Sequence, residues 1–373
     1  MRIGCPREIK PQEFRVGMTP DVVREATRQG HDVFIESGAG DGAGFSNEEY
    51  IAAGASVVPD GAAVFEEATM IVKVKEPQAE ELERLNSRHL LFTYLHLAPD
   101  PKQAEGLIRS GCTAIAYETI TAPDGSLPVL SPMSEVAGRL APQVGASALQ
   151  KANGGRGVLL GGVPGVPRSH VTVIGGGVVG THAARIALGF GAEVAILDLS
   201  LPRLRQIDET FQGKIQTVFA SRSSIEAQIA TADLVIGAVL IPGATAPKLV
   251  QRNDLANMKR GAVLVDVAID QGGCFETSRA TTHAEPTYFV DEVLHYCVAN
   301  MPGAVPRTAT LALSNVTSTL ILDLANKGWQ TACRENSHLR NGLNVHSGCI
   351  THPAVAEALN RECADAKNIV GVD

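Results

Sequence analysis

Aromatic residues, an excess of positive charge and long apolar runs are scarce or missing in this 373-residue chain. Phe, Trp and Tyr make up only 4% of the residues, which disfavours a platform for stacking single-stranded nucleic acid. Lys and Arg number 32 against 40 Asp and Glu, so the basic face that binds nucleic-acid phosphates is not predicted. No uninterrupted apolar run approaches the length of about 18 residues that a membrane span needs. We therefore expect a soluble protein without a nucleic-acid or membrane partner.

The seven cysteines also exclude some classes of protein. Their number is odd and no two follow the C-x-x-C spacing, so neither a disulfide framework nor a zinc site is predicted. Reduced thiols are typical of a cytoplasmic protein. The N-terminal segment MRIGCPREIK has no apolar core after Arg2 and is not predicted to be a signal peptide. These features favour a cytoplasmic location.

Glycine, with 37 residues, is abundant, and short apolar segments alternate with amphipathic ones along the whole chain. This alternation is typical of α/β proteins with buried parallel strands. It predicts a clear series of strands at 171–174, 193–198, 216–220, 233–239, 262–269 and 288–293. The first 130 residues alternate in the same way, and long helices are predicted over 132–152 and 307–328. We therefore predict an α/β fold with two Rossmann-like, doubly wound parallel-sheet domains joined by long helices.

A glycine-rich turn follows the first strand of that series. Gly175, Gly177 and Gly180 form the pattern G-x-G-x-x-G between the apolar segment 171–174 and a predicted helix. In a dinucleotide-binding fold the first glycine permits a tight turn and the second lets the backbone approach the pyrophosphate. The third lets the helix pack close to the strand. A glycine-rich turn without a ligand is the alternative, but the context predicts a dinucleotide site.

Asp198 ends the next predicted strand. An acidic residue at this position accepts hydrogen bonds from the ribose hydroxyls of adenosine and repels a 2′-phosphate, so NAD is predicted in preference to NADP. Asp198 could instead only cap the following helix. Arg203 and Arg205 lie close by in the sequence, and either guanidinium could bind the 2′-phosphate of NADP. The cofactor preference therefore stays open at this point.

Basic residues follow three predicted strands of the first domain. Arg15 lies in the loop after the first strand, Lys75 follows MIVKV, and His96 follows LLFTYL. Because the carboxyl ends of strands line the ligand crevice of an open α/β sheet, these residues together suggest a pocket for a small anion. Taken singly, each could be a solvated charge or a histidine satisfied by the backbone. Since alternate strand residues share a face, Lys73 or Lys75 could be only a surface charge.

Asp270 is the acidic candidate of the second domain. It is predicted to end the strand in VDVAIDQGG and to lie at the cleft, although it could equally be a turn residue before two glycines. From these placements we predict a discontinuous substrate-binding and catalytic domain, 1–130 with 307–373, and an NAD-binding Rossmann domain, 131–306.

Segments along the chain resemble the alanine dehydrogenase family. They include RIGCPREIK with RVGMTP, IVKVKEP, LFTYLHLA, AIAYET, PMSEVAGR, GGVPGVPRSHVTVIGGGVVGTHAA, AVLIPGA, VDVAIDQGGCFETSR, TTHAEPTY and HYCVANMPGAVPRTAT. The resemblance runs from residue 1 to about 328 and continues more loosely to the end. It implies the reversible, NAD-dependent oxidative deamination of L-alanine to pyruvate and ammonium by hydride transfer from Cα to the nicotinamide. It also implies a homohexamer whose cofactor cleft closes by rotation of one domain on the other.

The resemblance also implies roles for individual residues. Arg15 and Lys75 correspond to substrate-binding residues, Arg15 offering a planar fork to the carboxylate and Lys75 polarising the carbonyl. His96 and Asp270 correspond to acid/base residues: His96 moves protons to and from the added water, and Asp270 holds the ammonium. The family's cofactor contacts fall on Ser134, Val178, Val179, Asp198, Arg203, Val239, Leu240, Val267, Ala268, Ile269, Asp270, Arg279, Val298, Ala299, Asn300 and Met301.

Two positions depart from the family pattern. Many relatives have a serine near the adenine after the third strand, where this chain has Ala220 and then Ser221. Some relatives hold a divalent cation near the start of the tail, where this chain has Asp323 and Lys327. A protonated lysine has no lone pair with which to coordinate, so no metal is predicted.

Two other functions are alternatives. The NAD-binding subunit of proton-translocating transhydrogenase resembles alanine dehydrogenase in both domains, but it has no aspartate that matches Asp270. Its arginine-rich mobile loop is also absent from this sequence. A non-catalytic NAD sensor would be favoured by the loss of Lys75, His96 or Asp270, and all three are present. Both alternatives are therefore less favoured than an amino-acid dehydrogenase.

Overall fold

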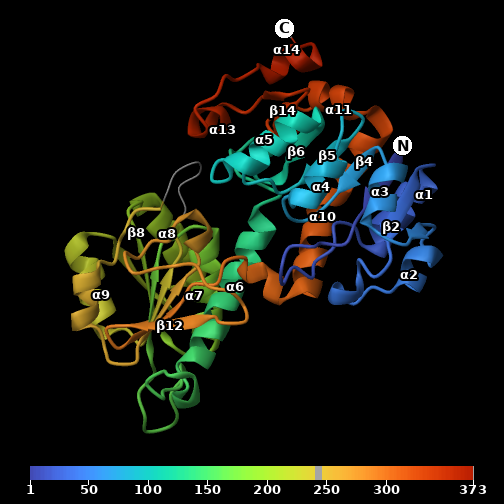
Figure 1. Ribbon diagram of the computed structural model, residues 1–373. Coiled ribbons are helices and arrows are strands. Elements are labelled where there is room, and N and C mark those ends of the chain that lie inside the picture. Colours follow the sequence, from blue (N-terminus) through green and yellow to red (C-terminus); the bar gives the residue numbers. More distant parts are fainter. Residues whose placement is uncertain (240–245, 373) are drawn as a thin grey trace. The chain divides into compact units, whose positions relative to one another are not determined.

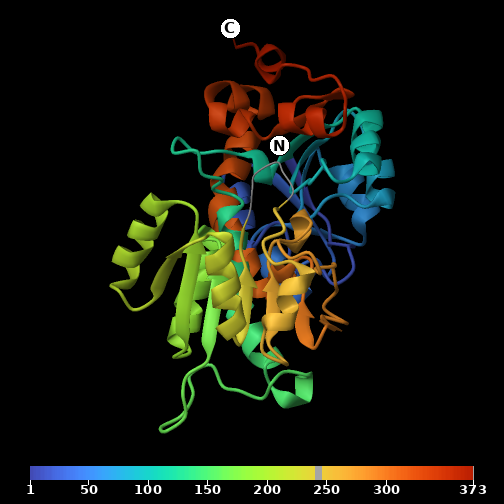
Figure 2. The ribbon, with the colours of Figure 1, turned by 90° about the vertical axis from the view of Figure 1, so that its left-hand side faces the viewer.

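The computed structural model describes residues 1–239 and 246–372 (Figure 1). The chain divides into two compact units. Unit 1 comprises Met1–Met133 and Val305–Asp373, and unit 2 comprises Ser134–Ala304. Each unit contains one open sheet with helices packed against it, and Figure 2 shows both units from a second direction.

The sheet of unit 1 is doubly wound. Within the described residues its strands are β1 (Arg2–Cys5), β2 (Asp32–Glu36), β3 (Ser56–Val58), β4 (Met70–Val72), β5 (Leu90–Thr93), β6 (Thr113–Ala116), β14 (Leu343–His346) and β15 (Cys349–Ile350). Their order in the sheet is β15-β14-β6-β5-β4-β1-β2-β3. The strands from β6 to β3 are parallel, and β14 and β15 are antiparallel additions next to β6. Counted along the chain, the parallel strands follow the order 3-2-1-4-5-6 of doubly wound dinucleotide folds.

Burial explains why these strands form. Every residue of β4, β5 and β6 is buried, so their sequences are continuous apolar runs rather than alternating patterns. Ile71, Leu91 and Val345 belong to one core cluster, which shows that the C-terminal tail packs into unit 1. The helical segments described in unit 1 are α1 (Pro20–Arg28), η1 (Asp41–Ala43), α2 (Asn47–Ala52), α3 (Gly61–Glu67), α4 (Ala79–Arg84), α5 (Pro101–Ser110), η2 (Tyr117–Thr119), α10 (Pro306–Lys327), α11 (Trp329–Glu335), α12 (Ser337–Arg340), α13 (Pro353–Ala358) and α14 (Ala366–Val370).

Unit 2 repeats the same strand order. Its described strands are β7 (His170–Ile174), β8 (Glu193–Asp198), β9 (Gln216–Phe219), β10 (Leu234–Gly237), β11 (Val263–Asp266), β12 (Thr287–Val290) and β13 (Val293–Tyr296). The order in the sheet is β12-β13-β11-β10-β7-β8-β9, in which β12 alone of the described strands is antiparallel. The helical segments are α6 (Ser131–Ala148), which begins in the last residues of unit 1, η3 (Lys151–Asn153), α7 (Val178–Gly189), α8 (Leu201–Phe211), α9 (Arg222–Thr231), η4 (Arg252–Asn257), η5 (Ile269–Gln271) and η6 (Met301–Ala304). The predicted α/β class with two Rossmann-like sheets is confirmed.

Two predicted strands and one predicted helix are wrong in their extent. The segment 288–293 is not one strand, because Asp291 and Glu292 have φ of 47° and 65° and form the turn of the β12–β13 hairpin. The segment 262–269 ends as a strand at Asp266, after which the chain enters the 3₁₀ turn η5. The long helix predicted to reach residue 152 ends at Ala148.

One helix among the described residues is long and apolar enough to cross a membrane. An 18-residue window of α10 has a mean hydropathy of 1.2, although polar residues interrupt its apolar ones. The window is 44% buried, and Leu313, Ile321 and Leu324 of this helix lie in the interior of unit 1. Because core helices have the same composition, this helix is weak evidence for a membrane span.

Candidate active site

The glycine turn of unit 2 joins β7 directly to α7. Gly175 has φ of 106°, a left-handed conformation that other residues rarely adopt. A Cβ on Gly180 would lie 1.8 Å from the carbonyl oxygen of Gly175, so only glycine lets α7 pack this close to the turn. At Gly177 no described atom lies within 4 Å of the position that a Cβ would take. The backbone there is open to a ligand in front of the N-terminus of α7.

Asp198 and Arg203 hold this turn in place. Asp198 accepts hydrogen bonds from the backbone N–H of Gly176 at 2.7 Å and of Ser200 at 2.8 Å. Ser200, and not Asp198, caps α8, because its hydroxyl accepts the N–H of Arg203. Arg203 donates from Nε to the carbonyl oxygen of Gly176 at 2.6 Å and from Nη2 to the hydroxyl of Thr181 at 2.7 Å. The alternative in which Asp198 only caps the next helix is therefore wrong.

The remaining predicted contacts of the first half of unit 2 surround this turn. Val178 and Val179 form the first turn of α7, and Ser134 is half-buried in α6. α6 packs against α7 through Gly138, where a Cβ would lie 2.4 Å from the carbonyl oxygen of Val179. Val239 follows β10 and packs against the core. Leu240 lies outside the described residues.

Asp270 is exposed and lies four residues beyond the end of its strand, in the 3₁₀ turn η5. The prediction that it ends the strand is wrong, because the strand stops at Asp266. The Asp270 carboxylate accepts a hydrogen bond from the backbone N–H of Asn300 at 3.3 Å. This contact joins η5, with Val267, Ala268 and Ile269 before Asp270, to the segment that begins at Val298.

A second aspartate, which the sequence analysis missed, organises the loop around Asp270. Asp266 is completely buried and accepts hydrogen bonds from the backbone N–H of Ala268 at 3.1 Å and of Cys274 at 2.9 Å. It also accepts one from the hydroxyl of Ser278 at 2.5 Å. Burial raises the pKa of Asp266, an effect that these hydrogen bonds oppose. Asp266 therefore fixes both ends of the loop that carries Asp270.

The last predicted cofactor contacts lie on the segments that follow this loop. Val298 is buried and forms a parallel bridge with Thr281, and the N–H of Ala299 donates to the carbonyl oxygen of Thr281 at 3.1 Å. Asn300 has a left-handed φ of 64°, and Met301 is buried at the start of η6. The Arg279 guanidinium lies over the Tyr288 ring, 4.2 Å from its centroid.

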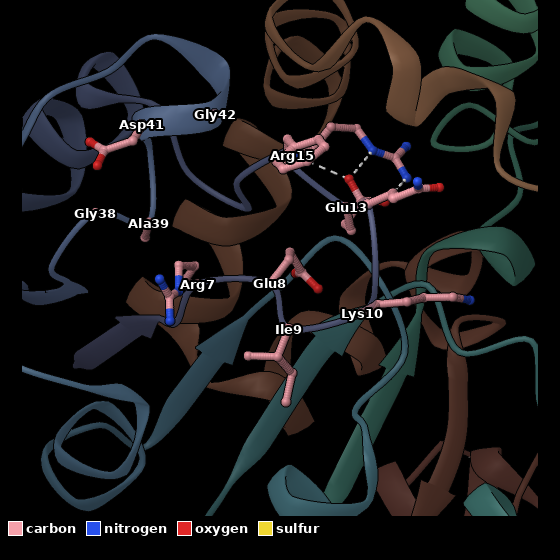
Figure 3. A pocket seen from close by; sticks show the side chains of 12 residues that line it. Arg7, Glu8, Ile9, Lys10, Glu13, Arg15, Gly38, Ala39, Asp41 and Gly42 are labelled. Carbon is pink, nitrogen blue, oxygen red and sulfur yellow. Dashed lines mark hydrogen bonds and ion pairs between the residues drawn. The ribbon is translucent and has the colours of Figure 1, made fainter. Parts of the chain in front are cut away.

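Arg15 of unit 1 is held by a neighbouring glutamate. Its guanidinium donates from Nε to Glu13 at 2.7 Å and from Nη2 to the other oxygen of Glu13 at 2.5 Å, an interaction that Figure 3 shows from close by. Nη1 donates to the sulfur of Met133 at 3.1 Å. Both charged side chains are buried, so Glu13 sets the orientation of the Arg15 fork.

A pocket of about 510 Å³ opens beside this pair. Figure 3 shows Arg15 and Glu13 on one side of it and Asp41 on the other. Asp41 and Gly42 belong to η1, which follows β2. Its lining consists of Arg7, Glu8, Ile9, Lys10, Gln12, Glu13, Phe14, Arg15, Gly38, Ala39, Asp41 and Gly42. Of the predicted substrate and catalytic residues, this pocket contains Arg15 but neither Lys75 nor His96.

Lys73 is not a surface charge, which excludes one of the alternatives for this segment. It is completely buried, and its Nζ lies 3.1 Å from Glu8 and 2.6 Å from Glu81. Burial raises the pKa of Glu8 to about 7, although Lys73 opposes this shift. Glu8 also accepts the backbone N–H of Val74 at 2.6 Å and of Lys75 at 3.4 Å. Glu8 thereby holds the segment on which Lys75, itself buried, is placed.

His96 has an unusual backbone conformation for a residue other than glycine, with φ of 49°. Its backbone N–H donates to the carboxylate of Glu118 at 2.6 Å, and its ring stacks on that of Tyr94 at 5.8 Å with 8° between the planes. Lys75 and His96 thus lie three residues beyond the neighbouring strands β4 and β5, whereas Arg15 lies ten residues beyond β1, the next strand of the sheet.

Sequence reasoning missed the carboxylates that support these residues: Glu8, Glu13 and Glu118 of unit 1 and Asp266 of unit 2. A partial signal was available, because an acidic residue inside an apolar run such as VLVDV must find donors when it is buried. The partners of Glu8 and Glu13 depend on the path of the long β1–α1 connection, so the sequence contains no comparable signal for these two residues.

Asp323 and Lys327, the position weighed for a divalent cation, form an ion pair. Lys327 lies 3.3 Å from Asp323 and 3.2 Å from Glu335. Among residues 1–239 and 246–372 no group of three or more His, Cys, Asp or Glu side chains is arranged to hold a metal ion. Ser221, at the other departure, caps α9 by accepting the N–H of Ser224.

Comparisons with known proteins agree along the whole chain. The family described as "Alanine dehydrogenase/PNT, N-terminal domain" matches residues 4–137, and "Alanine dehydrogenase/PNT, C-terminal domain" matches residues 141–353. The sequence is 57% identical to the alanine dehydrogenase of Halomonas elongata over 371 residues, 100% of each chain. It is 53% identical to that of Mycolicibacterium smegmatis over 366 residues, 98% of this chain and 99% of the other.

Solved structures support the same family. An L-alanine dehydrogenase is similar with a TM-score of 0.93 and 50% identity, over 96% of this chain and 99% of the other. A transhydrogenase from Sinorhizobium meliloti has a TM-score of 0.82 but 26% identity, over 95% and 100% of the two chains. The higher identity favours the dehydrogenases over the transhydrogenase. This protein is an oxidoreductase that belongs to the alanine dehydrogenase/PNT family.

Proposed function

We propose that this enzyme catalyses the reversible, NAD-dependent oxidative deamination of L-alanine to pyruvate and ammonium. One observation carries the proposal. Arg15, Lys75 and His96 follow β1, β4 and β5, which are adjacent parallel strands, in a chain that is 57% identical to an alanine dehydrogenase over its full length. The carboxyl ends of such strands are where open α/β sheets bind their ligands.

The glycine turn fits NAD. The backbone at Gly177 is open to a ligand, and only glycine fits at positions 175 and 180. A pyrophosphate bound at a helix N-terminus requires this arrangement. The Asp198 carboxylate has acceptor capacity left for the ribose hydroxyls. When bound, NAD supplies the acceptor for the hydride that leaves the Cα of alanine. The further contacts that we propose are Ser134, Val178, Val179, Arg203, Val239, Leu240, Val267, Ala268, Ile269, Asp270, Arg279, Val298, Ala299, Asn300 and Met301.

Unit 1 is proposed to bind the substrate. The planar Arg15 fork suits a carboxylate, and its buried surroundings strengthen charge-assisted hydrogen bonds. Glu13 already orients the fork through Nε and Nη2. The Lys75 ammonium donates to the carboxylate and to the carbonyl oxygen of pyruvate, which polarises the carbonyl for attack by ammonia.

His96 and Asp270 are proposed to move the protons. The His96 imidazole takes a proton from the water that adds to iminopyruvate, and it returns a proton to the leaving nitrogen as the carbinolamine collapses. The Asp270 carboxylate accepts a hydrogen bond from the substrate ammonium and takes its proton. The exposed position of Asp270 in η5 supports this role, because the carboxylate is accessible to a ligand.

We also propose that the enzyme works in the cytoplasm as a homohexamer. Seven free cysteines support a reducing compartment. The hexamer rests on the family to which the chain belongs. Light scattering after size-exclusion chromatography tests it, since a particle with the mass of six chains is expected.

The proposed activity is tested by following absorbance at 340 nm with a panel of L-amino acids, each with NAD and with NADP. We expect L-alanine and NAD to give the highest rate at alkaline pH, and pyruvate with ammonium and NADH to give the reverse reaction. Hydride exchange between NADH and an oxidised NAD analogue, without any reaction of L-alanine, would instead indicate a transhydrogenase-like hydride carrier.

A further inference from the structure

His96 and Glu118 meet because the strands that precede them are neighbours. His96 follows β5 and Glu118 lies in η2, directly after β6. The last residues of these strands, Thr93 and Ala116, are partners in the parallel register. The sheet therefore brings the side chain of Glu118 to the backbone of the loop that carries His96.

The carboxylate of Glu118 binds two consecutive backbone N–H groups. It accepts the N–H of Leu95 at 3.2 Å from each of its oxygens, and the N–H of His96 at 2.6 Å. Successive N–H groups point to one side when one residue of the pair is left-handed, which makes a small concave site for an anion. His96, with φ of 49°, supplies the left-handed residue. Since this conformation is unfavourable for residues other than glycine, the hydrogen bonds to Glu118 stabilise the loop.

The ring of His96 is oriented from the other side by Tyr94. The two rings stack, and the Tyr94 hydroxyl donates to the carbonyl oxygen of Val129 at 2.6 Å, which fixes the Tyr94 ring in the interior. Tyr117, the residue before Glu118, packs edge-on against Tyr94 at 5.0 Å. Within the described residues no hydrogen bond reaches the ring nitrogens of His96, so Glu118 contacts its backbone and leaves the imidazole to the substrate.

We propose that Glu118 is a positioning residue that holds the His96 imidazole in the orientation needed for proton transfer. The proposal rests on the proposed function, in which His96 moves the proton. Glu118 acts through the backbone of residues 95 and 96, so removing its charge should slow proton transfer without weakening cofactor binding.

The first test is Glu118→Gln, which keeps the side-chain volume but turns an N–H₂ group toward one of the two backbone donors. We expect kcat for reductive amination to fall about 10-fold or more, a part of the contribution that a well-placed acid/base group makes. The Kd of NADH and the KM of pyruvate should change little. Asp124→Asn is the matched control, because exposed Asp124 also accepts a backbone N–H, from Ser126, away from His96. An unchanged kcat in Glu118→Gln would overturn the proposal.

The second test separates positioning of His96 from a general loss of structure. In His96→Gly the left-handed backbone is natural for glycine, and imidazole in solution can replace the missing side chain. Glu118→Gln should lower kcat when His96 is present but should leave the residual or imidazole-rescued rate of His96→Gly unchanged. Equal losses in both backgrounds would show that Glu118 does not act through His96, and the proposal would be wrong.

The two proposals fail in different ways. If His96→Gly itself keeps the wild-type rate, the role of His96 in the proposed function is wrong, and the role of Glu118 falls with it. If His96→Gly is inactive and Glu118→Gln is fully active, the proposed function stands and only the positioning role is refuted.

Discussion

The two units have the same strand order but differ in the first connection of the sheet. In unit 2, Gly175–Gly177 alone separate β7 from α7. In unit 1 the connection from β1 to α1 runs over residues 6–19 and contains Glu8, Glu13 and Arg15. The short connection presents backbone and a helix N-terminus, whereas the long one presents buried charged side chains.

Under the proposed function, this difference lets one topology support two kinds of binding. A turn with no side chains can approach a large anion closely and needs no charged residue to do so. A small substrate needs groups of defined direction, and in unit 1 each of these has a carboxylate partner: Glu13 for Arg15, Glu8 for the Lys75 segment and Glu118 for His96. Variants of the β1–α1 connection and of the glycine turn should therefore separate substrate binding from cofactor binding.

Replacement of the proposed proton carriers should have the largest effect. His96→Ala in unit 1 and Asp270→Asn in unit 2 should each lower kcat by about 10²- to 10⁴-fold, the usual contribution of a general acid or base. NADH should still bind, as measured by its fluorescence. A near-normal rate in either variant would show that its assigned role is wrong.

Arg15→Met should affect substrate binding next most strongly. Loss of a charged, bidentate contact of about 1.5–3 kcal/mol should raise the KM of pyruvate about 10- to 150-fold while the Kd of NADH stays near wild type. Arg28→Met is the matched control, because Arg28 pairs with Glu25 on the exposed surface of the same unit. A pyruvate KM that does not change would place the substrate carboxylate elsewhere.

The glycine turn of unit 2 offers a pair of substitutions with opposite consequences. Gly180→Ala puts a methyl group 1.8 Å from a carbonyl oxygen, so it should lower Tm. Gly177→Ala meets no described neighbour within 4 Å and should keep Tm, but it should weaken NADH binding about 10-fold by crowding the pyrophosphate. Differential scanning fluorimetry and NADH titration measure the two effects. If Gly177→Ala kept both the Tm and the NADH affinity of the wild type, the result would argue against a pyrophosphate at this turn.

The smallest expected effect is a pH dependence of stability that comes from Glu8. Burial raises its pKa to about 7 in the folded protein, above the value of about 4.3 for an unfolded chain. The folded state therefore holds the proton more tightly, and this stabilisation is lost as the pH rises through about 7. The difference in Tm, Glu8→Gln minus wild type, should become more positive from about pH 5 to about pH 8. The Tm of the exposed control Glu25→Gln should follow that of the wild type at each pH. If the Tm of Glu8→Gln also ran parallel to that of the wild type, the raised pKa of Glu8 would be contradicted.

The fold could be predicted from the sequence largely because its strands are buried on both faces. Runs such as MIV, LLFT and VLVD are typical of interior strands, and the ends of MIV and LLFT identify where Lys75 and His96 lie. The β12–β13 hairpin could not be recognised in the same way, because Asp291 and Glu292 interrupt the run with a turn that usually contains glycine or asparagine.

The charge partners within the site were harder to predict. Lys73 and Lys75 are equivalent by strand period, and only the positions of Glu8 and Glu81 show that Lys73 belongs to a buried ion cluster. Asp266 and Asp270 lie in one short motif, in which only the apolar run VLVDV indicates that Asp266 is the buried one. The contact between Lys73 and Glu8 joins segments 65 residues apart, which no local pattern contains.

The antiparallel strands β14 and β15 have a consequence for how this enzyme can be engineered. They cover the side of β6 that would otherwise expose unpaired backbone groups, and Asn344 donates to the hydroxyl of Thr119, next to Glu118. A shortened protein that ends before residue 343 would present an open edge strand and would be prone to self-association. Affinity tags and fusion partners should therefore not replace β14 or β15, because these strands shield the sheet that carries the proposed substrate residues.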